Sequence, residues 1–263
     1  MRSTEQFFAE SPVFTLERFA GTVGKNVSTT VAYRRLAYFT RAGRVKRIRN
    51  ALYAVVPPGI APEAYTPDPY LVAAAAGRGA PLGYHTALEL LGVAQSVFRS
   101  KTVVSARRNA PFTFGDYPVE FARPPAALTG SADPDLGATA IDYGGTVIRV
   151  TSRERTLVDC LAQPTRAGGL EEVLNSVNGF GVVDLVALEA YLLALDMRRA
   201  WAVTGYYLEK RQAHLFVPDD VLTRWERERP RSPQYWLRGQ RGGFLAKRWN
   251  LVVPETIGTI LGD

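Results

Sequence analysis

Apolar residues recur at helical spacing in residues 28–42. At about 100° per residue, Ala32, Leu36 and Phe39 fall on one side of a helix, which predicts the side that packs on a core. The opposite side carries small, hydroxyl-bearing or basic side chains: Thr30, Arg34, Ala37, Tyr38 and Arg41, with Tyr33 and Arg35 on the flanks. The pattern predicts an amphipathic helix whose outer face is positively charged.

The elements around this helix follow the order helix, helix, helix, hairpin. The predicted elements are helices over 4–9, 15–20 and 28–42 and strands over 45–48 and 52–55. Thr15 and Ser28 suit the caps of the second and third helices, and Gly43 suits the left-handed residue after the third. Turns are predicted over 21–27 and at Arg49-Asn50. This order is typical of a winged helix-turn-helix.

Prolines mark a boundary after this unit. Five of them lie in residues 57–69, where they exclude a helix and favour a stiff, extended spacer. The predicted domains are therefore a winged helix-turn-helix DNA-binding domain over 1–56, a proline-rich linker over 57–69 and a larger domain over 70–263.

The larger domain changes from strand-like to helical patterns along its length. It predicts helices over 71–76 and 84–91, strands over 101–105, 112–114, 119–122, 138–142 and 147–150, and helices over 168–177, 183–195 and 199–210. Tyr143-Gly144-Gly145 is a hairpin turn signal. Thr151-x-x-Glu154 has the form of a capping box, which predicts one more helix ahead of the last three. Strands followed by helices favour an α+β class, with an N-terminal winged helix-turn-helix followed by a larger mixed α/β C-terminal domain.

Charge is concentrated at the N-terminal end. Residues 1–56 hold ten Lys/Arg against three Glu, a net charge of +7, whereas the rest of the chain balances to zero. Such a charge density on a small folded unit is typical of nucleic-acid-binding proteins. The single cysteine excludes an internal disulfide framework. With no signal-like N-terminus and no membrane-length apolar run, the sequence predicts a soluble cytoplasmic protein without membrane contact.

The third helix and the hairpin predict a surface that binds double-stranded DNA. Residues at the start of a recognition helix approach base edges, and Arg34 can bond a guanine edge with two hydrogen bonds. The hairpin cations would contact phosphates and fix position. The predicted DNA-binding residues are Ser28, Thr29, Thr30, Tyr33, Arg34, Arg35, Arg41, Lys46, Arg47 and Arg49. A merely solvated basic face, or a helical unit that contacts protein, is the alternative interpretation.

The order of several motifs resembles a known family. The segments Val31-Ala32-Tyr33-Arg34-Arg35-Leu36 and Ala42-Gly43-Arg44-Val45-Lys46-Arg47-Ile48, then Ala51-Leu52-Tyr53 and Pro57, are similar to the N-terminal winged helix of the AbiEi-like antitoxins. Residues 83–93, 152–159, 168–174 and 205–209 are similar to later segments of that family. The resemblance covers about residues 10 to 210, and the chain departs from the shorter family pattern after Lys210.

The resemblance implies a transcriptional repressor that acts as the antitoxin of a type IV toxin–antitoxin system and controls its own operon. Its implied partners are operator DNA with inverted repeats and a nucleotidyltransferase-like toxin of the AbiEii kind, which it opposes without a stable complex. Self-association on repeated DNA sites is the expected role of the larger domain. The alternative is an interaction protein that binds and blocks its partner directly, with DNA binding secondary.

Residues 224–249 form a second basic stretch. They hold eight Lys/Arg against two Glu, a net charge of +6, interleaved with Trp225, Tyr235, Trp236, Phe244 and Trp249. The favoured interpretation packs the aromatic rings into the domain and leaves the arginines in water. The alternative is a second basic patch that contacts DNA or a partner through Arg238, Arg241, Lys247 and Arg248.

Catalytic chemistry has little support. His85 and His214 are far apart, and the sequence has no nucleophile elbow, phosphate-binding loop or zinc-ligand spacing. Asp116 and Glu120 are the nearest carboxylate pair for a metal-dependent nuclease, but the glutamate-x-lysine element of such enzymes is missing after Glu120. We therefore expect no enzymatic activity, no catalytic residue, no metal and no cofactor.

Three further residue types have structural interpretations. Arg155 and Asp159 are four apart on a predicted helix and suit a structural ion pair, of the kind often found at surfaces. Cys160 falls on the inner side of that helix and suits an inert core thiol. His85, at the start of a helix, suits a cap or a core contact.

Overall fold

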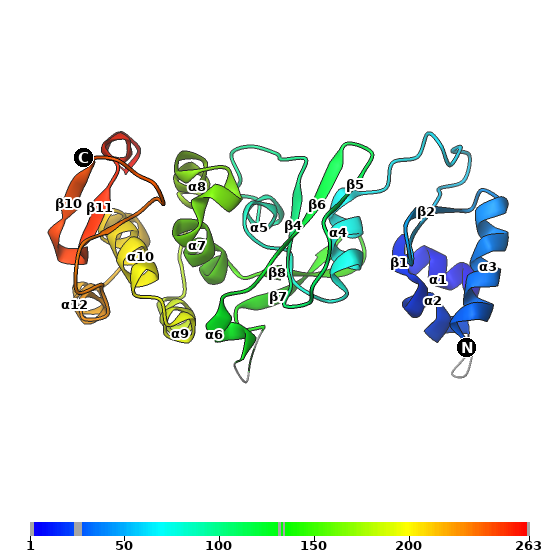
Figure 1. Cartoon of the computed structure of the whole chain (residues 1–263), viewed down its shortest axis with the longest axis horizontal. Coiled ribbons are helices and arrows are strands. Elements are labelled where there is room, and N and C mark those ends of the chain that lie inside the picture. Colours follow the sequence, from blue (N-terminus) through cyan, green and yellow to red (C-terminus); the bar gives the residue numbers. More distant parts are fainter. Residues whose placement is uncertain (1–2, 24–27, 131–132, 134, 262–263) are drawn as a thin grey trace. The chain divides into compact units, whose positions relative to one another are not determined.

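The computed structural model describes residues 3–23, 28–130, 133 and 135–261 (Figure 1). Helices and several small sheets make up the chain, which is mixed α/β in agreement with the predicted α+β class. The chain divides into two compact units. The first contains Met1–Leu82, Arg99–Ala122 and Ala140–Arg149, and the second contains Gly83–Phe98, Arg123–Thr139 and Val150–Asp263. Among the described residues, no helix combines the length and the apolar content that a membrane crossing requires.

The first unit begins with three helices and a three-stranded sheet. These elements are α1 (Thr4–Glu10), β1 (Val13–Thr15), α2 (Leu16–Val23), α3 (Thr29–Arg41), β2 (Val45–Arg49) and β3 (Leu52–Val55). The sheet has the order β1-β3-β2, and both pairs are antiparallel. Each element contributes to one core, whose buried members are Phe7, Phe8, Phe14, Phe19, Ala32, Leu36, Val45 and Tyr53. Burial of four phenylalanines explains how so small a segment holds together.

The predicted ends of these helices are largely confirmed. Thr15 Oγ1 accepts a hydrogen bond from the Arg18 N–H (3.3 Å), Ser28 Oγ accepts one from the Val31 N–H (3.4 Å), and Gly43 has φ of 71°. The start of the turn predicted over 21–27 is wrong, because α2 continues to Val23. The rest of that prediction, residues 24–27, lies outside the described residues. Strand β1 was not predicted, since three residues show no periodicity of their own and pair only because β3 lies beside them.

Residues 57–68 contain no helix or strand, as their prolines predict. They are not a free spacer, however, because two turns bend the segment and Lys46 Nζ donates a hydrogen bond to the Tyr65 carbonyl (2.7 Å). After it, Asp68 caps α4 (Pro69–Gly77) with hydrogen bonds from two backbone N–H groups. Helix α4 then packs against β1.

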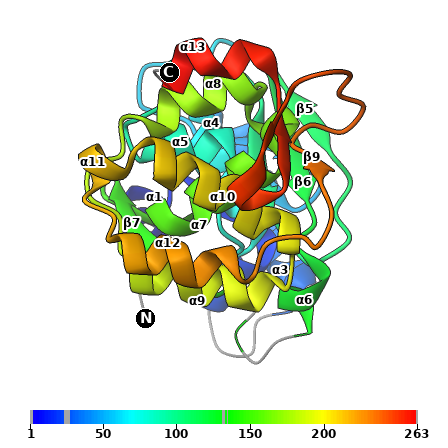
Figure 2. The ribbon, with the colours of Figure 1, turned by 90° about the vertical axis from the view of Figure 1, so that its left-hand side faces the viewer.

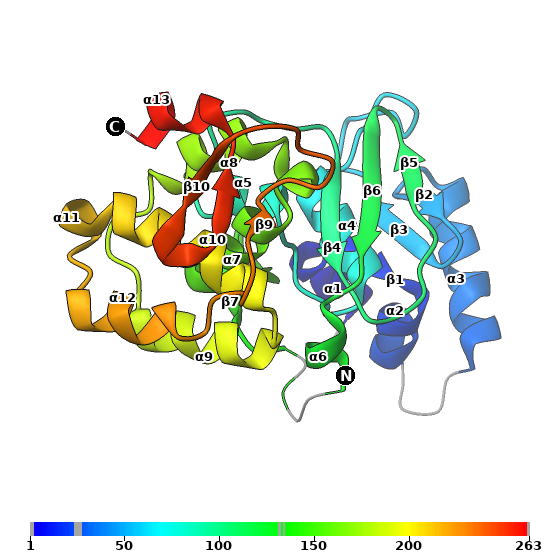
Figure 3. The same cartoon turned by 60° about the vertical axis from the view of Figure 1, so that its left-hand side comes forward.

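The remaining strands of the predicted set are all present. They are β4 (Lys101–Val104), β5 (Phe112–Phe114), β6 (Tyr117–Ala122), β7 (Ala138–Tyr143) and β8 (Thr146–Thr151). Figure 3 shows β6 between β4, to which it is parallel, and β5, with which it forms an antiparallel hairpin. The turn between β7 and β8 is made by Gly144 and Gly145, at φ of 58° and 81°. Such positive φ values explain why this turn signal was reliable.

The compact units follow other bounds than the predicted domains 1–56, 57–69 and 70–263. The predicted bounds rest on proline content and charge, which mark where helices stop. The end of a helix does not prevent later segments from packing on earlier ones, and here α4, which follows the prolines, packs against β1. That residues 1–56 fold as a domain of their own stays a prediction.

The second unit is mainly helical. Its helices are α5 (His85–Leu90), α6 (Ala126–Thr129), α7 (Arg153–Ala162), α8 (Leu170–Val177), α9 (Leu185–Leu195), α10 (Arg198–Lys210), α11 (Gln212–Leu215), α12 (Asp219–Glu226) and α13 (Gly258–Leu261), with short 3-10 turns η1 (Pro164–Ala167), η2 (Lys247–Trp249) and η3 (Glu255–Ile257). Its small sheet has the order β10-β11-β9, from β9 (Gln234–Tyr235), β10 (Phe244–Ala246) and β11 (Leu251–Val253). Figure 2 shows α9 and α12 side by side, where Arg224 pairs with Glu189 at 2.7 Å.

Helix α7 corrects two predictions. Its cap is Ser152, whose Oγ accepts a hydrogen bond from the Arg155 N–H (3.3 Å), whereas Thr151, the predicted cap, is the buried last residue of β8. The Arg155–Asp159 pair is confirmed at 3.4 Å, but both side chains are almost fully buried. Burial raises the pKa of Asp159, while Arg155 and a hydrogen bond from Tyr191 act in the opposite direction. The pair is thus part of the core and not a surface pair.

Candidate nucleic-acid interface

Helix α3 presents one buried and one exposed face. Ala32 and Leu36 are fully buried and Phe39 packs against the same core, as the helical spacing predicts. The other face is exposed, with Tyr33 at 49% and Tyr38 at 67% of full exposure. Seven exposed residues of α3 are predicted to face outward or to bind DNA: Thr29, Thr30, Tyr33, Arg34, Arg35, Tyr38 and Arg41. The described structure therefore places the predicted DNA-binding residues of this helix where a ligand can reach them.

The cations of α3 form no ion pair with any residue that the structure describes. Helix α3 contains no Asp or Glu. Among the described residues, none forms a hydrogen bond or ion pair with the guanidinium of Arg34, Arg35 or Arg41. The three charges are thus carried into solvent without compensation. Three positive charges without a paired carboxylate make the exposed face of α3 favourable for an anion.

Ser28 has a structural role beside its predicted one. Its side-chain oxygen accepts the Val31 N–H, which fixes the first turn of α3. The hydroxyl hydrogen is not used by that bond, so Ser28 can still donate to a phosphate oxygen.

The hairpin cations are less available than the sequence suggests. Lys46 is half-buried and bonds to the Tyr65 carbonyl. Arg49 donates to the Ala110 carbonyl (3.4 Å) and its guanidinium lies 4.4 Å from the centre of the Phe112 ring. Both residues were predicted to contact phosphates or to enter the minor groove, which stays a prediction, and in the structure both tie the hairpin to segments 19 and 61 residues away. Lys46 keeps two further N–H groups for other acceptors.

Arg47 is the exposed cation of the hairpin. Its side chain bonds only within the turn, to the Arg49 carbonyl (3.4 Å) and to Asn50 Oδ1 (3.3 Å). These neutral acceptors leave its charge uncompensated. Arg47 therefore stays the strongest candidate on the hairpin for a phosphate contact.

Arg44, between α3 and β2, differs from Arg47 because its charge is paired with a carboxylate. Both of its terminal nitrogens donate to Glu5 (2.7 and 2.6 Å), and the hydrogen bond from Arg44 lowers the pKa of that carboxyl. The guanidinium also lies 5.8 and 5.6 Å from the ring centres of Phe8 and Phe39. Arg44 is thus engaged in holding α1 to the end of α3.

One exposed basic pair was missed by the sequence analysis. Arg107 and Arg108 lie in the loop after β4, the same loop whose Ala110 receives Arg49. Residues 99–108 hold four Lys/Arg and no acid, a local signal that the neutral sum over residues 57–263 concealed.

In the second basic stretch, 224–249, the aromatic side chains pack inward. Trp225, Trp236 and Trp249 are all fully buried. The indole N–H of Trp236 donates to the Leu161 carbonyl (2.8 Å), and that of Trp249 donates to Glu209 Oε2 (2.8 Å). The favoured interpretation, in which aromatic rings pack this stretch onto the domain, is confirmed for these tryptophans. Tyr235 and Phe244 stay exposed.

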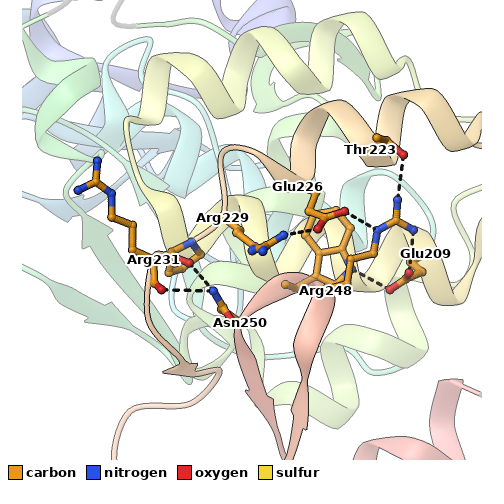
Figure 4. Close-up of polar contacts among 9 residues, drawn as sticks. Glu209, Thr223, Glu226, Arg229, Arg231, Arg248 and Asn250 are labelled. Carbon is orange, nitrogen blue, oxygen red and sulfur yellow. Dashed lines mark hydrogen bonds and ion pairs between the residues drawn. The ribbon is translucent and has the colours of Figure 1, made fainter.

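Arg248 is at the centre of a charge network (Figure 4). It bonds to Glu209 Oε1 (3.0 Å), to Glu226 Oε2 (3.2 Å) and to the Thr223 hydroxyl (3.2 Å). Glu226 also pairs with Arg229. Arg248 was named in the alternative second basic patch, but three carboxylates, those of Glu209, Glu226 and Asp219 (3.7 Å), lie close enough to neutralise its charge. The other members, Arg238, Arg241 and Lys247, are exposed, without an ion pair among the described residues.

The other groups singled out for chemistry are structural. Asp116 pairs with Arg99 at 3.4 Å on the surface, and Glu120 is exposed on β6. Within residues 3–23, 28–130, 133 and 135–261, no three His, Cys, Asp or Glu side chains gather as a metal site would require. Burial raises the pKa of the Cys160 thiol, which favours the unreactive form.

His85 is a core residue, as predicted. It is buried, stacks on Phe98 at 3.7 Å and lies 3.0 Å from Glu172 Oε1 through Nε2. Glu172 also accepts hydrogen bonds from the backbone and hydroxyl of Ser96 (3.1 and 3.0 Å). The imidazole thus links α5 to α8.

Comparison with known proteins gives a likeness of fold. No protein-family model matches the chain, and no curated protein matches it. The chain is similar to the solved crystal structure of the RV2827C protein from Mycobacterium tuberculosis, with 19% identity and a TM-score of 0.55. The match covers 92% of this chain and 86% of the other. At this identity the likeness shows the fold alone, and it extends over nearly the whole chain.

Proposed function

We propose that this protein is a DNA-binding transcriptional regulator, and that residues 3–56 act as a winged helix-turn-helix. The observation that carries the proposal is the outer face of α3, where Arg34, Arg35 and Arg41 are exposed on a helix without acidic residues. A protein that uses such a face for an uncharged or cationic partner would gain nothing from three uncompensated charges. Double-stranded DNA offers both a groove wide enough for a helix and a dense row of phosphates.

The proposed roles follow from position on the helix. Thr29, Thr30 and Tyr33 lie in the first turns of α3 and, with Arg34, contact base edges in the major groove. Arg35, Arg41 and Arg47 contact phosphates and set the register. Lys46 and Arg49 position the hairpin through Tyr65 and Ala110, and contact DNA only secondarily.

The biological role that we propose is repression of the protein's own operon as the antitoxin of a type IV toxin–antitoxin system. Support comes from the resemblance of segments in both units to the AbiEi-like antitoxins. The opposed toxin would be a nucleotidyltransferase-like protein of the AbiEii kind, and both proteins would act in the cytoplasm, where the operon lies.

The first test is binding of the full-length protein to its own upstream region by fluorescence anisotropy. A shuffled duplex of equal length and composition is the control, and each duplex is measured at two salt concentrations. We expect at least tenfold tighter binding to the native duplex, with affinity that falls as salt rises, by about 0.9 in logarithmic slope for each phosphate contacted. Equal affinity for the two duplexes would contradict a sequence-specific regulator.

The antitoxin role needs a separate test. Co-expression with the AbiEii-like toxin is expected to restore the growth that the toxin alone arrests, without co-purification of the two proteins. Restored growth with a stable complex would instead favour direct blocking of the toxin. Continued arrest in the presence of abundant protein would contradict the antitoxin role while leaving DNA binding intact.

A further inference from the structure

The first unit contains a cleft of about 450 Å³ that the proposed DNA contacts do not use. It lies among β1, α2, α4 and β8, and its walls include the apolar side chains of Phe14, Leu71, Ala75 and Val147. A volume of this size with largely apolar walls is typical of sites for small organic molecules. Helix α3 does not contribute to its walls.

Four arginines from four separate segments converge on this cleft. Arg18 comes from α2, Arg78 from the end of α4, Arg107 from the loop after β4 and Arg149 from β8. The single acidic residue in the lining is Glu17. Four cations against one anion give the lining a net charge of +3, which a neutral ligand would not require.

Two of these cations are already engaged and two are not. Arg78 pairs with Glu17 at 3.2 Å, and Arg149 donates to the Gly79 carbonyl at 3.0 Å. For the side chains of Arg18 and Arg107, no partner occurs in the part of the chain that the structure describes. The guanidinium groups of Arg18 and Arg107 thus have donors left for a ligand.

The backbone at Arg78 ends helix α4 at the edge of the cleft. Arg78 ends α4 in the left-handed region, with φ of 51°. Glycine or asparagine is the usual residue in that conformation, and other side chains there cost on the order of 1 kcal/mol. Asp196 and Phe216 end α9 and α11 in the same conformation, so it marks a helix end, and the link of Arg78 to the cleft is that its side chain lines the wall.

We propose that the cleft binds a small organic anion, one phosphate or carboxylate group on an apolar body. The acid group would lie between the guanidinium groups of Arg18 and Arg107, which can each donate two parallel hydrogen bonds. The apolar body would lie on Leu71, Ala75 and Val147. Nucleic acid is a poorer fit, because a duplex presents its phosphates on a convex surface and has no apolar group to fill a cleft.

Binding is tested on the full-length protein with 8-anilino-1-naphthalenesulfonate, a fluorescent probe with one acid group on an apolar body. We expect a single site, whose affinity falls at least tenfold in the Arg18→Gln/Arg107→Gln double variant. The matched control is Arg108→Gln, because Arg108 is the exposed neighbour of Arg107 and does not line the cleft. Its affinity is expected to stay within twofold of the parent protein. Unfolding curves of all variants verify that the fold is retained.

Two further measurements distinguish the contribution of charge from that of hydrophobic contact, and a preference for phosphate from a preference for carboxylate. N-phenyl-1-naphthylamine has the same apolar body without the acid group, and we expect it to bind at least tenfold more weakly. Phenyl phosphate and benzoate are then compared by the rise in unfolding temperature with concentration. Equal probe affinity in the double variant and the parent, equal binding of the uncharged probe, or no rise with either acid would overturn the proposal. None of these results depends on DNA, so they are independent of the proposed regulator.

Discussion

Helix α3 and residues 224–249 have similar compositions and opposite arrangements. Both combine arginines with aromatic side chains. On α3 the arginines and two tyrosines face solvent and no acid is present. In 224–249 the three tryptophans are buried, and Arg224, Arg229 and Arg248 are paired with carboxylates. The difference shows that a net charge, +3 on α3 and +6 in 224–249, says little until the acids that lie next to each cation are known.

The two regions differ because of where their acids come from. Arg248 meets Glu209 of α10 and Glu226 of α12, residues brought beside it by packing. Nothing in the described structure brings a carboxylate to the outer face of α3. Neutralised cations contribute little to binding an external anion, whereas exposed ones keep their full electrostatic effect. Four experiments test this difference between the two regions.

The largest effect is expected for Trp249→Ala. The ring is fully buried directly against Gly205 of α10, so its removal leaves a large cavity and should lower the free energy of unfolding by about 3 to 5 kcal/mol. Tyr235→Ala, at an aromatic residue of the same stretch that is 51% exposed, is the control and should change it by about 0.5 kcal/mol or less. Chemical denaturation measures both. Similar losses would show that the aromatic residues of 224–249 are not divided into core and surface.

The next effect concerns DNA. Arg34→Ala should weaken binding to the native upstream duplex by about 1 to 3 kcal/mol, roughly tenfold or more, and reduce discrimination against the shuffled duplex. Arg44→Ala also removes one positive charge, three residues after the end of α3, but Glu5 already neutralises that charge. It should change DNA affinity less than threefold once its fold is verified by unfolding. Anisotropy titrations measure the DNA affinity of both variants. Equal losses of affinity would mean that an unpaired arginine on α3 matters no more than a paired one beyond it.

The third experiment changes Glu172. Like Arg248, this residue is hydrogen-bonded to side chains from other elements, here His85 and Ser96. Burial acts to raise the pKa of Glu172, but hydrogen bonds from His85 and Ser96 together lower it below the ordinary 4.5. Its stabilisation is therefore present above pH 4.5 and is lost as the pH falls through the lowered value. Glu172→Gln should cost about 1 to 3 kcal/mol near pH 7, with a smaller difference from the parent protein in acid. A difference that does not depend on pH would contradict an ionised carboxylate.

The smallest effect is expected for the triple variant Arg238→Ala/Arg241→Ala/Lys247→Ala. These side chains are exposed, so stability should change by less than about 1 kcal/mol. The salt dependence of DNA binding should also be unchanged, because the proposed phosphate contacts are made by Arg35, Arg41 and Arg47. A slope reduced by about 0.9 for each residue would instead show that the second basic patch contacts phosphates.

Sequence reasoning was most accurate where structure depends on near neighbours. The helix over 28–42, its Ser28 cap, Gly43 at its end and the Gly144-Gly145 turn all depend on residues within three or four positions. The weakest region was the one after Lys210, where α12 and the β9–β11 sheet were not predicted. These three strands are two or three residues long, and β9 lies beside β11 only in the folded chain, where Gln234 pairs with Leu251.

The buried face of α3 and the place where positive charge is concentrated could both be read from the amino-acid sequence, because side-chain spacing and charge are local properties. Only the tertiary structure decided which cations remain available. Lys46 meets Tyr65, Arg49 meets Ala110 and Arg248 meets Glu209 across 19, 61 and 39 positions of the chain. The arginine-lined cleft depends in the same way on four segments that meet only in the folded chain. A charged side chain is neutralised by opposite charges within a few ångströms of it. When the partners are tens of residues apart in sequence, the fold alone brings them that close.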